Sequence, residues 1–212
     1  WRQSESTLEA LAGNRLLAGS DPIATVYAGH QFGSYNPQLG AGRAILLGEW
    51  LTDTGRRVDI QLKGAGATPF SRGGDGRSPI GPVVREFLIS EAMHTLGVPT
   101  TRALAAVATG ERVYRTRVEP GAILTRVASS HLRIGTAQYF AMTQGGEGLS
   151  TWVDYVLERH YGEAWERESS ATSASHSLSF YKSKASALLA EVGKRLASLA
   201  AHWQSLGFIH GV

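Results

Sequence analysis

The chain has 212 residues, of which 21 are Lys or Arg and 18 are Asp or Glu, so its formal net charge is +3. Hydrophobic residues make up 42% and charged residues 18%, a balance that allows a packed core and excludes a polyelectrolyte tail. The absence of Cys excludes disulfides, thiolate metal sites and a Cys nucleophile. No apolar run reaches the roughly 18 residues that span a bilayer, so we expect no membrane association.

Two features of the composition point to a binding function. Gly supplies 25 residues, well above the roughly 7% of average proteins, which indicates tight turns or backbone that approaches a ligand. Among the basic residues, 17 are Arg and 4 are Lys, and Lys63 is the only lysine in the first 181 residues. This scarcity makes Lys63 a candidate for a specific role.

The first half of the chain predicts a β-rich region. Apolar spacing predicts a short helix within residues 6–17, followed by irregular chain to residue 42. Residues 44–51 and 58–64 predict two strands that form a β-hairpin around the TDTGRR turn. A Gly-rich loop at 64–81 leads into an amphipathic helix from Pro82 to Gly97, which Pro can begin and Gly can end.

The second half changes from strands to helices. Short strands are predicted at 103–108 and 112–116, joined by a TGE turn, and at 122–127. Helical spacing then recurs, interrupted by a Ser/Thr-rich linker at 166–177. The helical stretches are 139–142, 149–160 and 185–206. This order predicts an α+β fold, with a β-rich lobe joined to an α-rich lobe.

The strand and helix around the Gly-rich loop carry a candidate cation–carboxylate pair. Alternation along the strand places Lys63 opposite the apolar face, where it either meets a phosphate or carboxylate or simply lies in solvent. Glu86 lies on the first turns of the helix, where it either pairs with Lys63 or interacts favourably with the helix dipole. A strand lysine and a helix glutamate are the layout with which protein kinases grip nucleotide phosphates.

Glycines and arginines elsewhere are candidates for the same anion. Gly40 and Gly42, directly before Arg43, either expose backbone N–H groups to a phosphate or form a simple turn. Arg126 shares its strand face with apolar residues, and Arg133 follows seven residues later; the pair could clamp a triphosphate or form surface ion pairs. The RGGDGR segment at 72–77 favours a nucleotide-contacting loop over an RNA-binding segment, and the His residues show no metal-ligand spacing.

Seven segments, in order along the chain, form a recognisable set of motifs. They are AGHQFG (28–33), PQLGAGRA (37–44), LKGAGATPFSRGGDGR (62–77), REFLISEAM (85–93), GVPTTRAL (97–104), LTRVASSHLRIG (124–135) and WQSLGFIHGV (203–212). Their order and spacing resemble the selenoprotein O family of pseudokinase-like protein adenylyltransferases. The resemblance implies a protein-kinase-like bilobal fold that binds ATP in a flipped orientation and transfers AMP to Ser, Thr or Tyr hydroxyls of proteins.

The resemblance also assigns roles to residues and lobes. Residues 1–127 become a nucleotide-binding N-terminal lobe, and residues 128–212 part of a helical C-terminal lobe that ends at the start of the catalytic loop. The family's lysine–glutamate pair falls on Lys63 and Glu86. Its ATP contacts fall on Gly40, Gly42, Arg43, Lys63, Asp75, Gly76, Arg126 and Arg133.

The family's catalytic machinery is expected after Val212. In the family, a general-base aspartate and metal-binding asparagine and aspartate residues follow a His-Gly-Val motif, which here is His210, Gly211 and Val212. The resemblance therefore implies a fragment with no catalytic base and no ligand for Mg²⁺ or Mn²⁺. We expect a monomer of the bacterial cytoplasm, with mitochondria as the alternative compartment.

Other functions remain open on the sequence alone. The enzyme alternatives are transfer of UMP from UTP and transfer of the γ-phosphate as in an ordinary kinase. A non-catalytic, nucleotide-binding pseudokinase is the alternative from another class. Nucleic-acid binding, based on RGGDGR and a pI near 9.3, ranks below these, and we expect no nucleic-acid partner.

Overall fold

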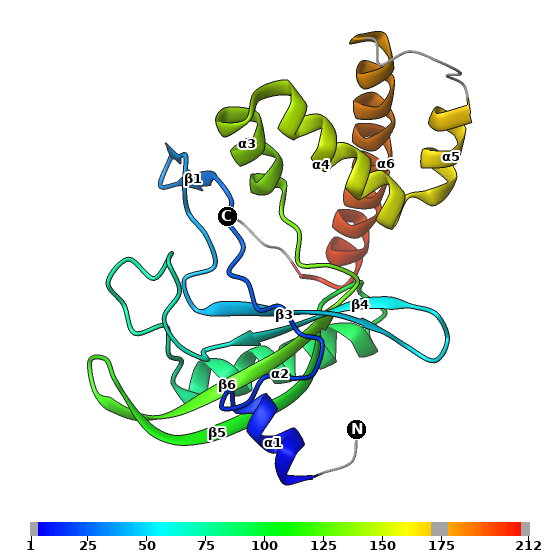
Figure 1. The fold of residues 1–212 in the computed structure, drawn as a ribbon. Coiled ribbons are helices and arrows are strands. Elements are labelled where there is room, and N and C mark those ends of the chain that lie inside the picture. Colours follow the sequence, from blue (N-terminus) through cyan, green and yellow to red (C-terminus); the bar gives the residue numbers. More distant parts are fainter. Residues whose placement is uncertain (1–3, 171–177, 209–212) are drawn as a thin grey trace. The chain divides into compact units, whose positions relative to one another are not determined.

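The structure, a computed structural model, describes residues 4–170 and 178–208. The chain divides into two compact units, residues 1–133 and residues 134–212. The first contains the strands and two helices, and the second is helical (Figure 1). The architecture is therefore α+β, as the sequence predicts, while the expected lobe boundary at residue 127 stays a prediction.

The first unit is built on a four-stranded antiparallel sheet with the strand order β3-β4-β6-β5. A separate two-stranded hairpin precedes it in the chain. The elements are α1 (Glu5–Leu11), β1 (Gly29–Gln31), β2 (Ser34–Asn36), β3 (Ala44–Leu51), β4 (Arg57–Lys63), α2 (Ile80–Thr95), β5 (Arg102–Tyr114) and β6 (Val118–Ala128).

Both faces of the central strands are covered. On one face, Leu62 and Ile123 belong to a cluster that also contains Leu47 and Ile60. On the other face, Ala122 and Leu124 of β6 pack with Val83 of α2, and Figure 1 shows α2 running along that face. Ile123 and Leu124 are almost completely buried, so β6 forms the centre of the unit and its residue positions are fixed from both sides.

The second unit consists of four helices around a small apolar core. Val153, Val156, Leu157, Ala164 and Leu188 are buried in it. The buried Lys184 ammonium lies 3.0 Å from Asp154 Oδ1 and 4.2 Å from the centre of the Trp165 ring. The helices are α3 (Ile134–Thr143), α4 (Gly145–His160), α5 (Gly162–Ser170) and α6 (Leu178–Ser205).

The structure corrects the expected strands at 103–108 and 112–116. Residues 103–114 form one continuous strand, β5, which ends at Tyr114, and the TGE segment is an irregularity in it rather than a reversal of the chain. The register with β6 shifts between Ala108 and Arg112, where Gly110 has a φ of +76°. A Gly in this conformation is typical of a β-bulge. The TGE residues thus do bend the chain, but they shift the register of the strand instead of reversing its direction.

Smaller points concern the first helix and the irregular stretches. The short helix expected within residues 6–17 is present as α1, which ends at Leu11 because the chain turns at Gly13, whose φ is +76°. The stretch expected to be irregular contains the β1–β2 hairpin. Part of the predicted linker, up to Ser170, is helical.

Two expectations fall on residues that the structure does not describe. The remainder of the Ser/Thr-rich linker, residues 171–177, lies outside the described ranges. The His-Gly-Val motif from His210 to Val212 lies outside them as well. The placement of a catalytic base and of metal ligands after Val212 therefore stays a prediction.

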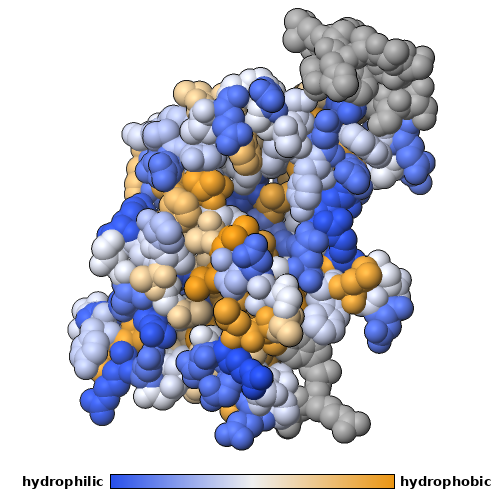
Figure 2. All heavy atoms as spheres, viewed as in Figure 1, coloured by the Kyte–Doolittle hydropathy of each residue, from blue (hydrophilic) through white to orange (hydrophobic). Residues whose placement is uncertain are grey.

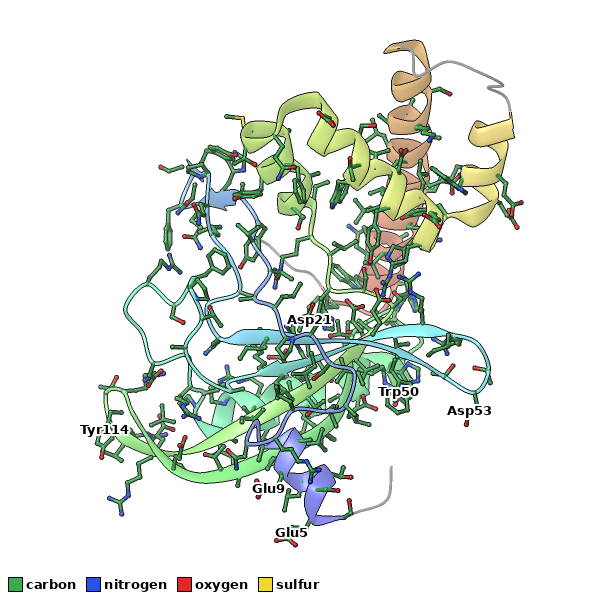
Figure 3. The ribbon with its side chains drawn as sticks, viewed as in Figure 1. Glu5, Glu9, Asp21, Trp50, Asp53 and Tyr114 are labelled. Carbon is green, nitrogen blue, oxygen red and sulfur yellow. The ribbon has the colours of Figure 1, made fainter. Side chains whose placement is uncertain are left out.

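The surface of the first unit leaves some apolar side chains exposed. Trp50, near the β3–β4 turn in Figure 3, and the neighbouring Leu51 are both exposed. On the face in view in Figure 2, hydrophobic residues lie among hydrophilic ones. Scattered exposed apolar residues of this kind are normal in folded proteins. In the described part of the chain, no helix is both long and apolar enough to cross a membrane.

Candidate functional site

A cavity of about 710 Å³ lies in the first unit. Its walls come from residues 40–44, the Gly-rich loop at 70–77, strands β4 and β6, and the segment 130–133. All eight residues to which the resemblance assigns ATP contacts line this one cavity: Gly40, Gly42, Arg43, Lys63, Asp75, Gly76, Arg126 and Arg133. Segments that are far apart in sequence thus meet where a nucleotide site is expected, although their roles stay predictions.

Strand β4 carries a row of polar residues, of which Gln61 and Lys63 line the cavity. Asp59, Gln61 and Lys63 alternate with the apolar Ile60 and Leu62, so the three polar side chains share the sheet face on which α2 packs. Asp59 and Gln61 are only 5% and 3% exposed. The alternative that this face of the strand lies in solvent is therefore wrong.

Glu86 of α2 joins two cations from neighbouring strands. The Lys63 ammonium donates a hydrogen bond to Glu86 Oε2, and the Arg126 guanidinium lies 3.2 Å from Glu86 Oε1. Arg126 also donates to the side-chain oxygen of Gln61, which faces it directly across the β4–β6 ladder. These contacts define an inner cluster of Lys63, Glu86 and Arg126, in which one carboxylate serves two cations.

The pKa values of the inner cluster show the competition between burial and charge. Burial acts to raise the pKa of Glu86, but the hydrogen bond from Lys63 and the charges of Lys63 and Arg126 outweigh it, so the pKa lies below its usual value. Burial, together with the charges of Arg126 and Arg43, lowers the pKa of Lys63 despite the hydrogen bond and charge of Glu86. Burial also lowers the pKa of Arg126 despite Glu86. Both cations are therefore destabilised relative to water, and an anionic ligand would relieve this.

Two further arginines, Arg43 and Arg133, bring positive charge to the cavity that no described carboxylate neutralises. Among the described residues, neither Arg43 nor Arg133 has a carboxylate within ion-pair distance, and Arg133 instead lies over the Tyr27 ring at 4.7 Å from its centre. Together with Lys63 and Arg126 they provide four cations beside the single carboxylate of the inner cluster. Such an excess of positive charge favours a polyanion.

A backbone contact sets the position of the segment that carries Arg133. The buried Asp59 side chain accepts a hydrogen bond of 2.7 Å from the backbone N–H of His131. Arg133 follows two residues later, so the polar row of β4 also anchors the chain that brings this arginine to the cavity. The sequence analysis missed both Asp59 and Gln61, although their alternation with Lys63 was a usable signal.

Close packing explains the glycines that precede β3. A Cβ atom at Gly40 would lie 2.2 Å from the Phe70 ring, and one at Gly42 would lie 2.7 Å from the Phe70 carbonyl oxygen. The Gly-rich loop therefore packs directly on this segment. It is also hydrogen-bonded there, since the Thr68 hydroxyl donates to the Ala41 carbonyl at 2.7 Å. The glycines are required by the fold whether or not the segment also contacts a ligand.

The loop residue Asp75 is held by a partner that the sequence analysis missed. Arg115, beside the β5–β6 turn, donates two hydrogen bonds to the Asp75 carboxylate, at 2.8 and 2.7 Å. The bond from Arg115 is the main cause that lowers the pKa of Asp75 to about 2. The Asp75 side chain therefore makes a structural contact in addition to lining the cavity. No local motif marks Arg115, because the contact joins residues 40 positions apart.

The cavity residues do not form a metal site. Among residues 4–170 and 178–208, no three His, Asp or Glu side chains are grouped so that they could hold an ion. Asp75, which lines the cavity, and Glu86, which contacts two of its cations, are each engaged by arginine or lysine. The described residues thus do not fit a Mg²⁺ or Mn²⁺ ion held by protein ligands alone.

Comparison with known proteins identifies the family of the chain. The family model described as "Protein adenylyltransferase SelO" matches residues 2–212. The chain is 59% identical over 210 residues to a protein named "Protein nucleotidyltransferase YdiU" from Alkalilimnicola ehrlichii, covering 99% of the chain and 40% of that protein.

Proteins of the same name from other bacteria are nearly as similar. The identity is 56% for Rhizobium rhizogenes, covering 95% of the chain and 37% of that protein, and 52% for Maridesulfovibrio salexigens, covering 96% and 39%. The chain thus spans about two fifths of the length of these curated relatives. The match to the family model covers almost the whole chain, and the chain belongs to the SelO family.

Proposed function

We propose that the protein carrying this chain is a protein adenylyltransferase, which moves AMP from ATP to Ser, Thr or Tyr hydroxyls of proteins. The observation that carries the proposal is the cavity in which Arg43, Lys63, Arg126 and Arg133 gather, with the Glu86 carboxylate paired to two of them. The names of the relatives support nucleotidyl transfer, and the family description supports AMP as the transferred group.

The arrangement of strand and helix supports a kinase-like N-terminal lobe as part of this proposal. A lysine at the end of β4 meets a glutamate of α2 on an antiparallel sheet, which is the relation of the phosphate-binding lysine and its glutamate in protein kinases. Glu86 keeps Lys63 oriented while the nucleotide is absent. The segment 134–212 would then begin the helical lobe.

The chemistry assigned to this chain is electrostatic. Lys63 and the three arginines would neutralise the triphosphate, so that a hydroxyl can attack the α-phosphorus. The bond between the α-phosphorus and the oxygen that bridges to the β-phosphorus then breaks, and pyrophosphate leaves. Preorganised charges of this kind stabilise the transition state without covalent participation. The general base and the ligands of the Mg²⁺ or Mn²⁺ that the family uses are assigned to residues after Val212.

Differently labelled nucleotides test the proposal. A full-length protein carrying this sequence is incubated with a bacterial lysate as acceptor and with ATP labelled at the α- or the γ-phosphate, in the presence of Mg²⁺ or Mn²⁺. We expect protein-bound label from the α position only. Label from the γ position would instead identify a kinase, and no label from either would favour a nucleotide-binding pseudokinase.

The same assay separates the nucleotides. The name of the relatives does not specify which nucleotide is transferred, so α-labelled UTP is compared with α-labelled ATP at equal concentrations. Preferential labelling by ATP supports the proposal. Preferential labelling by UTP would replace it with protein uridylyl transfer.

A further inference from the structure

The cavity wall that contains Asp75 is a strained turn. Arg72 has a φ of +51°, Gly73 of +79° and Gly76 of +64°, all in the left-handed region. Arg72 is the unusual member, because a residue with a Cβ atom is disfavoured there by roughly 1–2 kcal/mol. Such a conformation persists only where surrounding contacts determine it, so contacts that fix this turn are of functional interest.

The two halves of the loop are held in different ways. The first half is bound to the segment before β3, through Thr68 and through Ser71, whose hydroxyl donates to the Gly42 carbonyl at 2.5 Å. The second half reaches the β5–β6 hairpin, whose turn follows Tyr114 in Figure 3. There it is held by ion pairs, Asp75 with Arg115 at 2.7 Å and Arg77 with Glu111 at 2.8 Å.

Arg115 is the centre of the second attachment. Its guanidinium contacts both oxygens of Asp75 and also donates to the Arg77 carbonyl at 3.1 Å. Asp75 in turn accepts the backbone N–H of Arg77 at 2.9 Å. A planar guanidinium that binds a carboxylate with two parallel bonds fixes its orientation as well as its distance. One side chain of the hairpin thus contacts residues 75–77 at three acceptor atoms, in addition to the backbone hydrogen bond of 3.3 Å that the Gly66 N–H donates to the Gly76 carbonyl.

We propose that Arg115 is a positioning residue for nucleotide binding, which acts through Asp75 to hold the Arg72–Arg77 turn against the cavity. We call the Asp75–Arg115 pair the latch. The inference rests on the proposed function, because it takes the ligand of the cavity to be ATP. Arg115 lines the cavity as well, but its donors are directed to Asp75 and to the Arg77 and Tyr114 carbonyls.

A double-mutant cycle tests the route of action. ATP affinity is measured by calorimetry for the full-length protein and for its Arg115→Gln, Asp75→Asn and doubly substituted variants. Because exposed ion pairs contribute up to about 1 kcal/mol, we expect Arg115→Gln to weaken binding by about fivefold. In the Asp75→Asn background, the same substitution should have almost no further effect. An equal loss in both backgrounds would overturn the inference, since Arg115 would then act on the nucleotide directly.

Two further variants separate the latch from a general effect of charge. Arg117→Gln removes an arginine from the same turn that is 81% exposed and pairs only loosely with Glu119, and it should leave ATP affinity unchanged. Arg115→Lys keeps the charge but loses the two parallel hydrogen bonds to Asp75, so its ATP affinity should lie between those of the wild type and Arg115→Gln. A loss of affinity with Arg117→Gln as large as with Arg115→Gln would contradict the inference.

Amide hydrogen exchange tests the latch independently of ATP. In the nucleotide-free protein, Arg115→Gln should increase exchange in residues 72–77 by about fivefold and leave strand β4 unchanged. If the protein binds no ATP but the loop shows this response, the proposed function fails while the latch stands as a structural contact. If exchange in the loop does not change, the positioning role is wrong.

Discussion

The inner cluster and the latch both pair arginine or lysine with a carboxylate, but they differ in the elements that carry them and in their exposure to solvent. The inner cluster joins two strands and a helix, and the Arg126 side chain is only 13% exposed. The latch joins a loop to a hairpin, with Asp75 and Arg115 about 40% exposed. Water screens the latch, so it adds little stability, whereas the loss of one partner in the inner cluster leaves a poorly hydrated charge behind. The strands and the helix thus fix the positions of the inner-cluster charges, whereas the exposed Asp75–Arg115 pair positions the loop.

Replacing Lys63 should have the largest effect on function. Lys63→Ala removes a cation from the cavity and leaves Glu86 with Arg126 alone. For the full-length protein, we expect AMP transfer to fall by about 10²-fold or more, the usual cost of removing a preorganised charge at a developing anion. The rate of labelling from α-labelled ATP measures this. Arg57→Gln serves as control, because Arg57 lies on the same strand as Lys63 and the substitution breaks only an exposed pair with Glu49 of β3. Near-normal transfer by Lys63→Ala would refute the role of the inner cluster.

Removing the shared carboxylate should have the next largest effect. Glu86→Gln keeps a hydrogen-bond acceptor but leaves Lys63 and Arg126 to repel each other. Because hydrogen bonds to charged groups contribute about 1.5–3 kcal/mol, we expect transfer to fall by about 10- to 100-fold. ATP affinity should change less than the transfer rate, since the cations remain. A variant that loses affinity and keeps its maximal rate would show that Glu86 does not orient Lys63 for catalysis.

The loop can be tested by a pair of glycine substitutions that differ in one respect. Gly73 and Gly76 both have left-handed φ values, but a Cβ at Gly73 meets nothing within 4 Å, while one at Gly76 would lie 1.9 Å from the Gly66 carbonyl oxygen. Gly76→Ala should therefore lower stability by about 1–3 kcal/mol through this clash, in addition to the backbone strain, and should weaken ATP binding. Gly73→Ala should cost only the backbone strain. Denaturant unfolding and calorimetry measure both, and equal effects would exclude close packing at Gly76.

The latch should also show in the titration of Asp75, the smallest of these effects. The pKa of Asp75 is lowered to about 2, against about 3.9 for a free Asp. A lowered pKa means that the latch stabilises the folded state above pH 4 and that this stabilisation disappears as the pH falls towards 2. NMR of the side-chain carboxyl carbon should show Asp75 shifting to its ordinary pKa in Arg115→Gln. Glu91, whose pKa Arg102 lowers to about 2, should not shift, and an unchanged Asp75 would contradict the latch.

The sequence predicted regular elements well where period and turn residues agreed. The β3–β4 hairpin and α2 are present within two residues of their expected ends, and alternation correctly separated Lys63 from the apolar residues of β4. It could not predict Arg115 as the partner of Asp75, since that contact depends on how far β5 and β6 extend beyond β4. The Gly110 bulge shows the same limit, because a turn residue does not reveal whether the chain reverses or only shifts its register.

The polar row of β4 has a consequence for folding. Asp59, Gln61 and Lys63 alternate with residues of the apolar cluster around Ile123. A slip of β4 by one residue against β6 would turn the polar row into that cluster and the apolar residues towards Glu86. Mispaired sheets are therefore penalised on both faces at once. The row that brings Lys63 to the cavity thus also favours the correct alignment of the central strands.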